Sequence, residues 1–217
     1  MISIETVSVF VPASLALILA PGPDTFYVLS RALGAGRRVG VRSACGISAG
    51  VLVHTLAAVI GLSAILRGSA LAFRLVRYVG AAYLVFLGVQ TLRSSPGSLL
   101  DELDESRAAD GATADRGGFA RGLLVNVLNP KVALFFLAFL PPFVPATAPN
   151  ASLQLLVLGC LYAGLTLLYL AGVAVLSGTI RTALRSHAGI DDWLRYGTGG
   201  VLVGLGIVLA VERDVPS

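Results

Sequence analysis

The chain has 217 residues, of which 56% are hydrophobic and only 13% are charged, with a mean hydropathy of +0.85. This balance lies well outside that of soluble globular domains and predicts an all-α membrane protein. The net charge of +4 does not indicate a nucleic-acid partner, because the basic residues stand singly or in pairs beside apolar runs, as charges that flank membrane spans do.

Six apolar segments are long enough, or nearly so, to cross a bilayer, which takes about 20 residues of helix. Lys and Arg gather in the connections after the first, third and fifth segments, although Arg67, Arg74 and Arg77 oppose this bias. We therefore expect those connections in the cytoplasm and both termini outside it. No Lys or Arg precedes the first apolar run, so we expect it to be retained and not cleaved as a signal. The predicted spans cover residues 7–33, 43–66, 71–92, 118–144, 153–176 and 196–211.

The first and fourth segments are each interrupted. Pro21, Gly22 and Pro23 remove backbone donors and break the helical ladder of the first segment, and Asn129 and Pro130 interrupt the fourth in the corresponding place. Freed backbone groups inside a bilayer are tolerated only where protein or water surrounds them. We therefore expect two broken helices that face each other across one cavity.

Asp24 is an acidic residue that lies within a predicted span, directly after the first break. A carboxylate at that depth is costly unless it is paired, hydrated or protonated, which indicates a role in binding substrate or in coupling to protons. The alternative is structural, with Asp24 satisfying free amides of the helix that follows Pro23. The two are compatible, because such amides also attract a substrate carboxylate.

Lys131 is the matching cation of the second break. Its expected partner is Asp24 or a substrate carboxylate, and the alternative is that it snorkels to the membrane interface. Asn126 and Asn129 carry donors and acceptors for a zwitterionic substrate, or else they cap the broken helix. The predicted substrate site consists of Pro21, Gly22, Pro23, Asp24, Asn126, Asn129, Pro130 and Lys131.

His54, in the middle of the second segment, is a second candidate for proton coupling, beside Asp24. The alternative is a hydrogen-bonded core histidine. A single histidine without clustered carboxylates or cysteines does not predict a metal site, and no cofactor is expected. Candidate polar groups lining the cavity are Tyr27, Tyr83, Gln90 and Tyr162, although packing explains each of them equally well.

Glycines in the second and fifth segments are spaced to let neighbouring helices approach closely. They are Gly46 and Gly50 in the second segment, and Gly159 and Gly164 in the fifth.

Residues 94–117 form an acidic, polar segment that we predict to be a flexible cytoplasmic linker, with docking of a regulatory partner as the alternative. The linker divides the chain into two halves, 1–93 and 118–217. The apolar pattern of residues 77–88 recurs at 195–206, at a constant offset. With three spans in each half, the second half enters the membrane inverted, as in many secondary transporters. The expected fold is therefore six transmembrane helices as two inverted three-helix repeats, with broken helices 1 and 4.

The sequence has no G-x-x-x-x-G-K-[ST] loop for ATP hydrolysis and no H-E-x-x-H pattern. Residues 46–50 match G-x-S-x-G by spacing, but they lie inside a predicted span and not at the strand-to-helix turn that this hydrolase motif requires. We therefore expect a protein that is not an enzyme and that draws its energy from a gradient.

Further patterns accompany the two breaks: Gly34-x-Gly36-Arg37, Gly46-x-x-x-Gly50 with His54, Gly80-Ala-Ala-Tyr83, and Phe119-x-x-Gly122-x-x-x-Asn126. Together with the breaks they resemble the LysE/RhtB family of amino-acid exporters, the LysE-type translocators, over nearly the whole chain. The resemblance implies a six-span protein of the bacterial inner membrane that exports amino acids or their derivatives in exchange for protons. It does not fix the substrate. The chain departs from the family pattern in its longer acidic linker and its glycine-dense last span.

The leading hypothesis is a secondary transporter in the lipid bilayer that exports amino acids by proton antiport, with a homodimer left open. One alternative is a cation efflux carrier, because Asp24 and asparagine oxygens can hold a hydrated ion, although Lys131 counts against it. The other alternative is a non-transporting membrane scaffold or regulator, in which the breaks are packing kinks.

Overall fold

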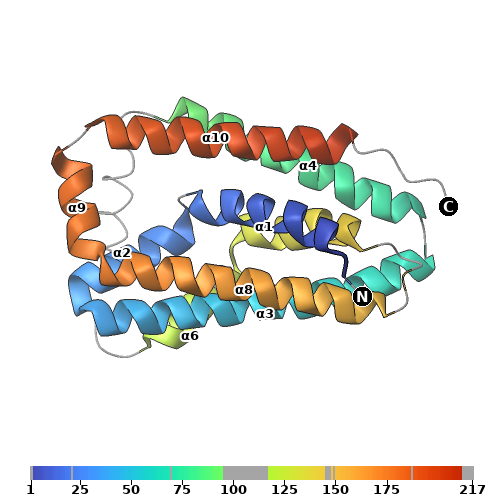
Figure 1. Ribbon diagram of the computed structural model, residues 1–217, viewed down its shortest axis with the longest axis horizontal. Coiled ribbons are helices and arrows are strands. Elements are labelled where there is room, and N and C mark those ends of the chain that lie inside the picture. Colours follow the sequence, from blue (N-terminus) through green and yellow to red (C-terminus); the bar gives the residue numbers. More distant parts are fainter. Residues whose placement is uncertain are drawn as a thin grey trace.

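A computed structural model of the chain describes residues 2–20, 22–68, 70–94, 117–144, 148, 150–186 and 188–211. The regular elements in these ranges are helices, most of which run along the long axis of the molecule (Figure 1). The predicted all-α class is therefore confirmed. The predicted linker at 94–117 falls almost entirely outside the described residues, as does Pro21.

The two predicted breaks are present. Helix α1 (Ile4–Leu19) meets α2 (Pro23–Ala35) at a bend of 55°, and α6 (Gly118–Val127) meets α7 (Pro130–Leu134) at a bend of 53°. In each case a proline is the first residue of the second helix, where its missing donor costs nothing, and an extended residue precedes it. Beyond α7 the chain continues as the π-helix η1 (Phe135–Phe139) and the 3-10 turn η2 (Pro141–Phe143).

Each of the other predicted spans corresponds to an unbroken helix. These helices are α3 (Arg37–Gly68), α4 (Ala70–Arg93), α8 (Ala151–Val175) and α10 (Ala188–Val211). Helices α3 and α10 begin six and eight residues before the predicted starts at 43 and 196. By length and apolar composition, α3 and α8 are able to cross a membrane, and each bent pair adds a further span if it counts as one. The described residues thus contain two to four such spans, and α10 contributes a shorter apolar helix, Arg195–Val211.

The short helix α9 (Ser177–Ser186) was not predicted. It follows α8 directly and lies across one end of the bundle, at the left of Figure 1. The sequence predicts a basic connection there, because ten residues of mixed polarity are too short and too polar for a span. The arginines of α9 recur at positions 181 and 185 and its apolar residues at 180, 183 and 184, a helical spacing that suits an amphipathic helix at the membrane surface.

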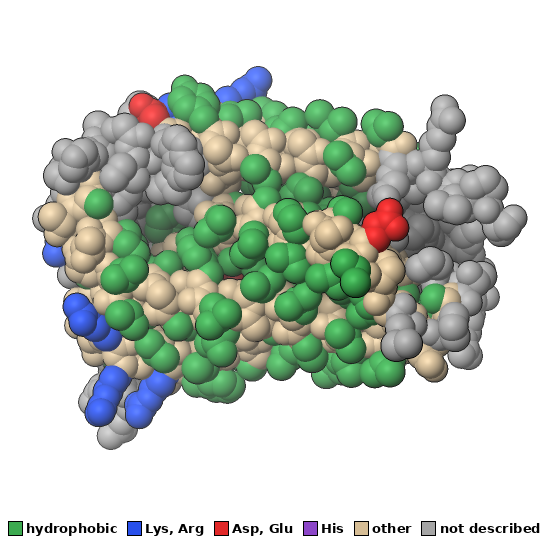
Figure 2. Space-filling model, viewed as in Figure 1, with side chains coloured by type: hydrophobic (Ala, Val, Ile, Leu, Met, Phe, Trp, Pro, Cys, Tyr) green, Lys and Arg blue, Asp and Glu red, His purple; other side chains and the backbone are tan. Residues whose placement is uncertain are grey.

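The helices enclose an apolar core and leave an apolar outer surface. Phe10, Phe135 and Leu158 are fully buried where α1, η1 and α8 meet, and Ile47 is fully buried in a second cluster around α2. In contrast, many large apolar side chains are exposed, such as Leu168. Figure 2 shows apolar side chains across the middle of one face and the visible Lys and Arg side chains in its left half. Such a surface suits a protein surrounded by lipid.

Glycines bring α3 and α6 into backbone contact. A Cβ atom added at Gly46 would lie 2.0 Å from the carbonyl oxygen of Phe119, and one at Gly122 would lie 2.3 Å from that of Ser43. No larger side chain fits at either position without moving the helices apart. The predicted close approach at Gly46 is therefore confirmed.

The paired glycines of α8 differ from each other. A Cβ at Gly159 would lie 2.1 Å from Cγ2 of Thr55 on α3, so this glycine is also needed for close packing. A Cβ at Gly164 would meet nothing within 4 Å. The prediction for Gly164 is wrong, because its side of α8 faces outward.

Helices α4 and α10 pack closely along one side of the molecule (Figure 1). A Cβ at Gly88 would lie 2.7 Å from Cγ2 of Val203, and a Cβ at Gly206 would lie 2.7 Å from Cγ2 of Val85. The sequence offset that relates Tyr78 to Tyr196, 118 residues, also relates Gly88 to Gly206 and Val85 to Val203. The two contacts are thus the same contact with the helices exchanged, as in a two-fold interface.

Candidate functional site

The two helix breaks meet at Asp24. This residue occupies the first turn of α2, opposite the end of α6 and the start of α7. Asn126 Nδ2 donates a hydrogen bond to Asp24 Oδ2 at 2.7 Å, and Asn129 Nδ2 donates one to Asp24 Oδ1 at 3.1 Å. Each oxygen of the carboxylate therefore accepts a bond from the opposite break. These amide bonds favour the charged carboxylate, which would otherwise be costly at this depth.

Asn129 has two roles at once. Its Oδ1 accepts a hydrogen bond from the backbone nitrogen of Lys131 at 3.1 Å and so caps α7, while its Nδ2 reaches Asp24. The predicted cap is therefore present, and the same side chain contacts the other break, while its role toward a substrate stays a prediction. Because the cap fixes the amide plane, its donor is held toward the carboxylate.

Lys131 satisfies the backbone that the first break sets free. Its Nζ donates a hydrogen bond to the carbonyl oxygen of Ala20 at 3.0 Å, just past the last residue of α1. Terminal carbonyls of a helix lack partners within the helix and attract cations. The direct hydrogen-bond partner of this ammonium is thus a carbonyl and not Asp24, and the side chain lies among the breaks instead of snorkelling outward.

Asn126 is fully buried and connects the site to α3. Its Oδ1 has no hydrogen-bond partner, and a Cβ at Gly50 would lie 2.7 Å from that oxygen, so the glycine provides the space for this side chain. His54 Nε2 lies 3.0 Å from the backbone oxygen of Asn126, which only accepts, so this nitrogen donates. The ring of His54 also stacks on Phe136, with centroids 6.2 Å apart. His54 thus reaches Asp24 through Asn126 and not directly.

A small cavity adjoins the carboxylate. Its water-accessible volume is about 30 Å³, and its lining includes Asp24, Asn126, Lys131 and Tyr162. A water molecule needs roughly 10–15 Å³ by this measure, so the cavity has room for water but not for an amino acid.

A larger cavity lies on the other side of the breaks, between them and the α4–α10 pair. Its water-accessible volume is about 360 Å³. Tyr83 and Gln90 line it, as predicted, whereas Tyr162 lines the smaller cavity and Tyr27 lines neither. The other residues around it are Gly22, Pro23, Phe26, Leu87, Thr91, Ser94, Asn129, Pro130, Lys131, Arg195 and Leu202.

The structure brings the described members of the predicted substrate site around these two cavities, whereas His54 borders neither. Sequence reasoning missed Ala20 and Arg195. The carbonyl of Ala20 could have been found, because a residue just before a helix break has a free carbonyl. Arg195 was counted as a connection charge, and nothing in its sequence context distinguished it from the others. In the described ranges, His, Cys, Asp and Glu form no cluster of three that could hold a metal ion.

The chain is thus a multi-pass membrane protein in which two broken helices meet at a buried charged site, an arrangement found in membrane transporters. The family model of the LysE type translocator matches residues 15–213, and the chain belongs to this family. It is accordingly a transporter and not an enzyme.

Similar proteins come from several bacteria. An uncharacterized membrane protein of Pseudomonas aeruginosa is 32% identical over 195 residues, which are 89% of each chain. An uncharacterized membrane protein of Bacillus subtilis is 28% identical over 202 residues, 91% of this chain and 95% of the relative. The leucine efflux protein of Salmonella typhimurium is 30% identical over 174 residues, 80% of this chain and 79% of the relative. No solved structure matches the chain.

Proposed function

We propose that this protein exports amino acids or their derivatives from the cytoplasm across the bacterial inner membrane, by antiport with protons. Membership of the LysE type translocator family and the similarity to a leucine efflux protein support an amino-acid substrate. Leucine is therefore the first solute to test.

One observation carries the mechanism: the Asp24 carboxylate holds the two breaks together through Asn126 and Asn129. A carboxylate that takes up a proton loses much of its capacity to accept these bonds. A substrate ammonium that binds Asp24 competes for the same oxygens. Either event loosens the contact between the two halves, so the carboxylate is suited to couple proton and substrate binding to alternating access.

The other residues of the proposed site have complementary roles. The helical hydrogen bonding is interrupted at the breaks by Pro21, Gly22, Pro23 and Pro130, which leaves backbone groups free. Lys131 supplies positive charge for a substrate carboxylate. His54 is the second candidate for proton coupling, through the backbone oxygen of Asn126. We assign the substrate to the space around these residues.

We further propose six transmembrane spans as two inverted repeats, 1–93 and 118–217, joined by a cytoplasmic linker, with both termini extracytoplasmic. The reciprocal contacts of Gly88 with Val203 and of Gly206 with Val85 support the repeat. The start of α1 and the end of α10 lie at the same end of the bundle in Figure 1, which suits an even number of crossings. The distribution of Lys and Arg supports the orientation.

The test is release of labelled leucine from liposomes that contain the purified protein, with and without a pH gradient. Asp24→Asn and Lys131→Ala should abolish gradient-dependent release. Glu5→Gln and Arg38→Ala remove exposed charges away from the breaks and should not. Leucine release that does not depend on the pH gradient would contradict proton antiport but not leucine export. Flux of metal ions without amino acids would favour a cation carrier, and no flux of any solute would favour a scaffold.

A further inference from the structure

The larger cavity is the space in which a solute fits. Its volume of about 360 Å³ falls within the range of roughly 300–1,000 Å³ that is typical of small-molecule sites. The cavity beside Asp24, at about 30 Å³, has room for water but not for a whole amino acid. Gly22, Asn129 and Lys131 line both cavities, so a solute in the larger one touches the breaks.

The charged side chains that line the larger cavity are both basic. Among the described residues of the lining they are Lys131 and Arg195, whereas Asp24 lines the smaller cavity. Arg195 is ion-paired with Asp192, which does not line the cavity, and Lys131 has no ion pair among the described lining residues. Such a lining favours an anionic group over a cationic one. The apolar side chains of the lining, which suit a neutral side chain, belong to Phe26, Leu87 and Leu202.

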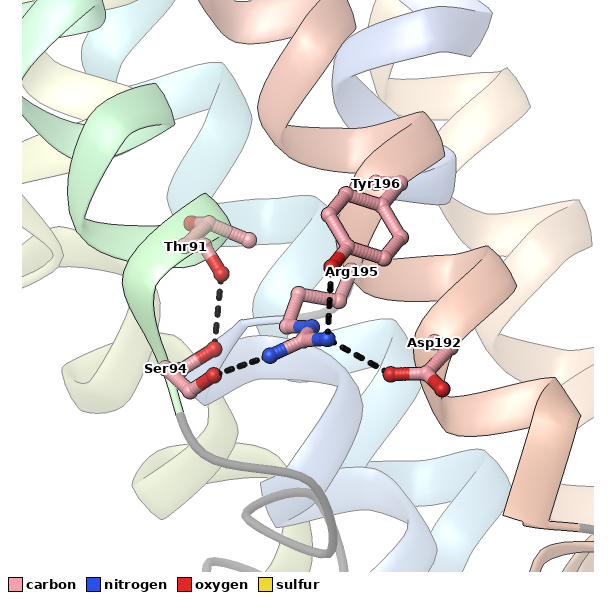
Figure 3. Close-up of polar contacts among 5 residues, drawn as sticks. All are labelled: Thr91, Ser94, Asp192, Arg195 and Tyr196. Atoms are coloured by element: carbon pink, nitrogen blue, oxygen red, sulfur yellow. Dashed lines mark hydrogen bonds and ion pairs between the residues drawn. The ribbon is translucent and has the colours of Figure 1, made fainter.

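Arg195 is held in place before any solute arrives. It bridges the start of the apolar part of α10 and the end of α4, where Nη1 donates to the carbonyl oxygen of Ser94 (Figure 3). Its Nη2 donates to Asp192 Oδ1 at 2.6 Å and to the hydroxyl of Tyr196 at 3.1 Å. The side chain is only 11% exposed. The guanidinium is thus oriented by its neighbours and not by solvent.

One donor of this guanidinium is unused. The Nε atom of Arg195 is buried and has no hydrogen-bond partner. A buried donor without an acceptor is unfavourable, and a charge-assisted bond to a carboxylate oxygen is stronger than one to a neutral acceptor. Because Arg195 lines the cavity, a carboxylate that approaches the guanidinium there would supply the missing acceptor.

We propose that Arg195 binds the carboxylate of the transported solute in the larger cavity, which admits amino acids with neutral or acidic side chains and rejects basic ones. This inference rests on the proposed export of amino acids. It adds to that proposal a binding residue at the far wall of the cavity and a class of substrate.

Competition in liposomes tests the proposal in the wild-type protein. Unlabelled leucine, glutamate, lysine or leucinamide, which lacks the carboxylate, is added on both sides during release of labelled leucine. Leucine and glutamate should inhibit at concentrations roughly tenfold or more below those of leucinamide and lysine. Equal inhibition by leucine and leucinamide would overturn the role of a carboxylate, and equal inhibition by lysine would overturn the charge selection.

Variants then assign the effect to Arg195. Arg195→Gln should raise the half-inhibitory concentration of leucine roughly tenfold and leave that of leucinamide unchanged, because only leucine loses a partner. Arg195→Lys should keep part of the preference, since it retains the charge without the planar fork. Arg38→Gln, which alters an exposed arginine of α3, should behave as the wild type.

If Arg195 has only a structural role, Arg195→Gln should change the half-inhibitory concentrations of leucine and leucinamide by the same factor. That result would overturn the proposal. Circular dichroism in detergent shows whether each variant folds. If Arg195→Gln does not fold, the wild-type competition and Arg195→Lys still decide. Absence of any leucine release from the wild type would overturn the export function itself, which is a different result from equal competition.

Discussion

Asn129 Nδ2 donates a hydrogen bond to Asp24 Oδ1 across 105 residues of sequence. The bond joins the second helix break to the first, and the same amide caps the helix that follows it. One side chain therefore couples the local geometry of α7 to the position of the buried carboxylate. The cap uses Oδ1 of Asn129 and the bridge to Asp24 uses its Nδ2, so a mutation can remove one without the other.

Asn129→Ser should separate the two roles. Serine also caps helices well, but its hydroxyl is too short to reach Asp24. We expect leucine release from liposomes to fall roughly tenfold or more, as for loss of a hydrogen bond to a charged group, with little change in the thermal unfolding of α-helix in detergent. Asn129→Ala removes the cap as well and should cost about a further 1 kcal/mol in stability. Equal stability losses in both variants would contradict this division.

Gly50→Ala should disturb the site indirectly, by displacing the side chain of Asn126. The added methyl group would lie 2.7 Å from Asn126 Oδ1, so the side chain that donates to Asp24 has to move. We expect destabilisation of about 1–3 kcal/mol in denaturant unfolding, together with reduced leucine release. The control is Gly164→Ala, whose methyl group meets nothing within 4 Å and which should be neutral or slightly stabilising. Similar losses in both would show that the clash with Asn126 is not responsible.

Gly88→Ala and Gly206→Ala should have matching effects, because their contacts across α4 and α10 are equivalent. Each added methyl group would lie 2.7 Å from a valine Cγ2 of the other helix. We expect each substitution to lower the unfolding temperature by a similar amount, through overpacking of about 1–3 kcal/mol. Gly204→Ala on α10, which has open space, serves as the control. A large effect at only one of the two positions would argue against the symmetric contact.

Phe135→Ala should destabilise the protein strongly. This side chain is fully buried, and its ring lies 4.7 Å from that of Phe139 and 5.0 Å from that of Tyr162, centroid to centroid. Its removal leaves a cavity in the segment that follows the second break, at a cost of roughly 3–5 kcal/mol. Phe86→Ala makes the same chemical change at a side chain of α4 that is 60% exposed and should cost far less. Denaturant unfolding in detergent compares the two.

The helix breaks could be predicted because proline and glycine have fixed consequences for the backbone. Pro23 and Pro130 each begin a new helix after an extended residue, whereas Pro12 lies inside α1, and an apolar environment limits what the freed groups can do. The long apolar runs fixed the positions of α3 and α8 in the same way. Helix α9 escaped prediction because ten residues of mixed polarity resemble a connection.

The partners of the charged groups could not be predicted from the chain alone. They depend on how closely the helices approach, which Gly46 and Gly50 decide on α3. At that distance Asn126 reaches Asp24, and Lys131 reaches a backbone carbonyl that no pattern of side chains reveals. The sequence therefore indicated which residues meet, but not which atoms bond.

Among the described residues, Lys131, Gly22 and Asn129 are the three that line both cavities and so lie between them. The ammonium group of Lys131 is therefore close to any group that occupies either cavity. In the weakly screening interior of a protein, a charge that appears on one side alters the potential felt on the other. A protonation event in one cavity and a charged solute in the other would thus affect each other's binding without contact.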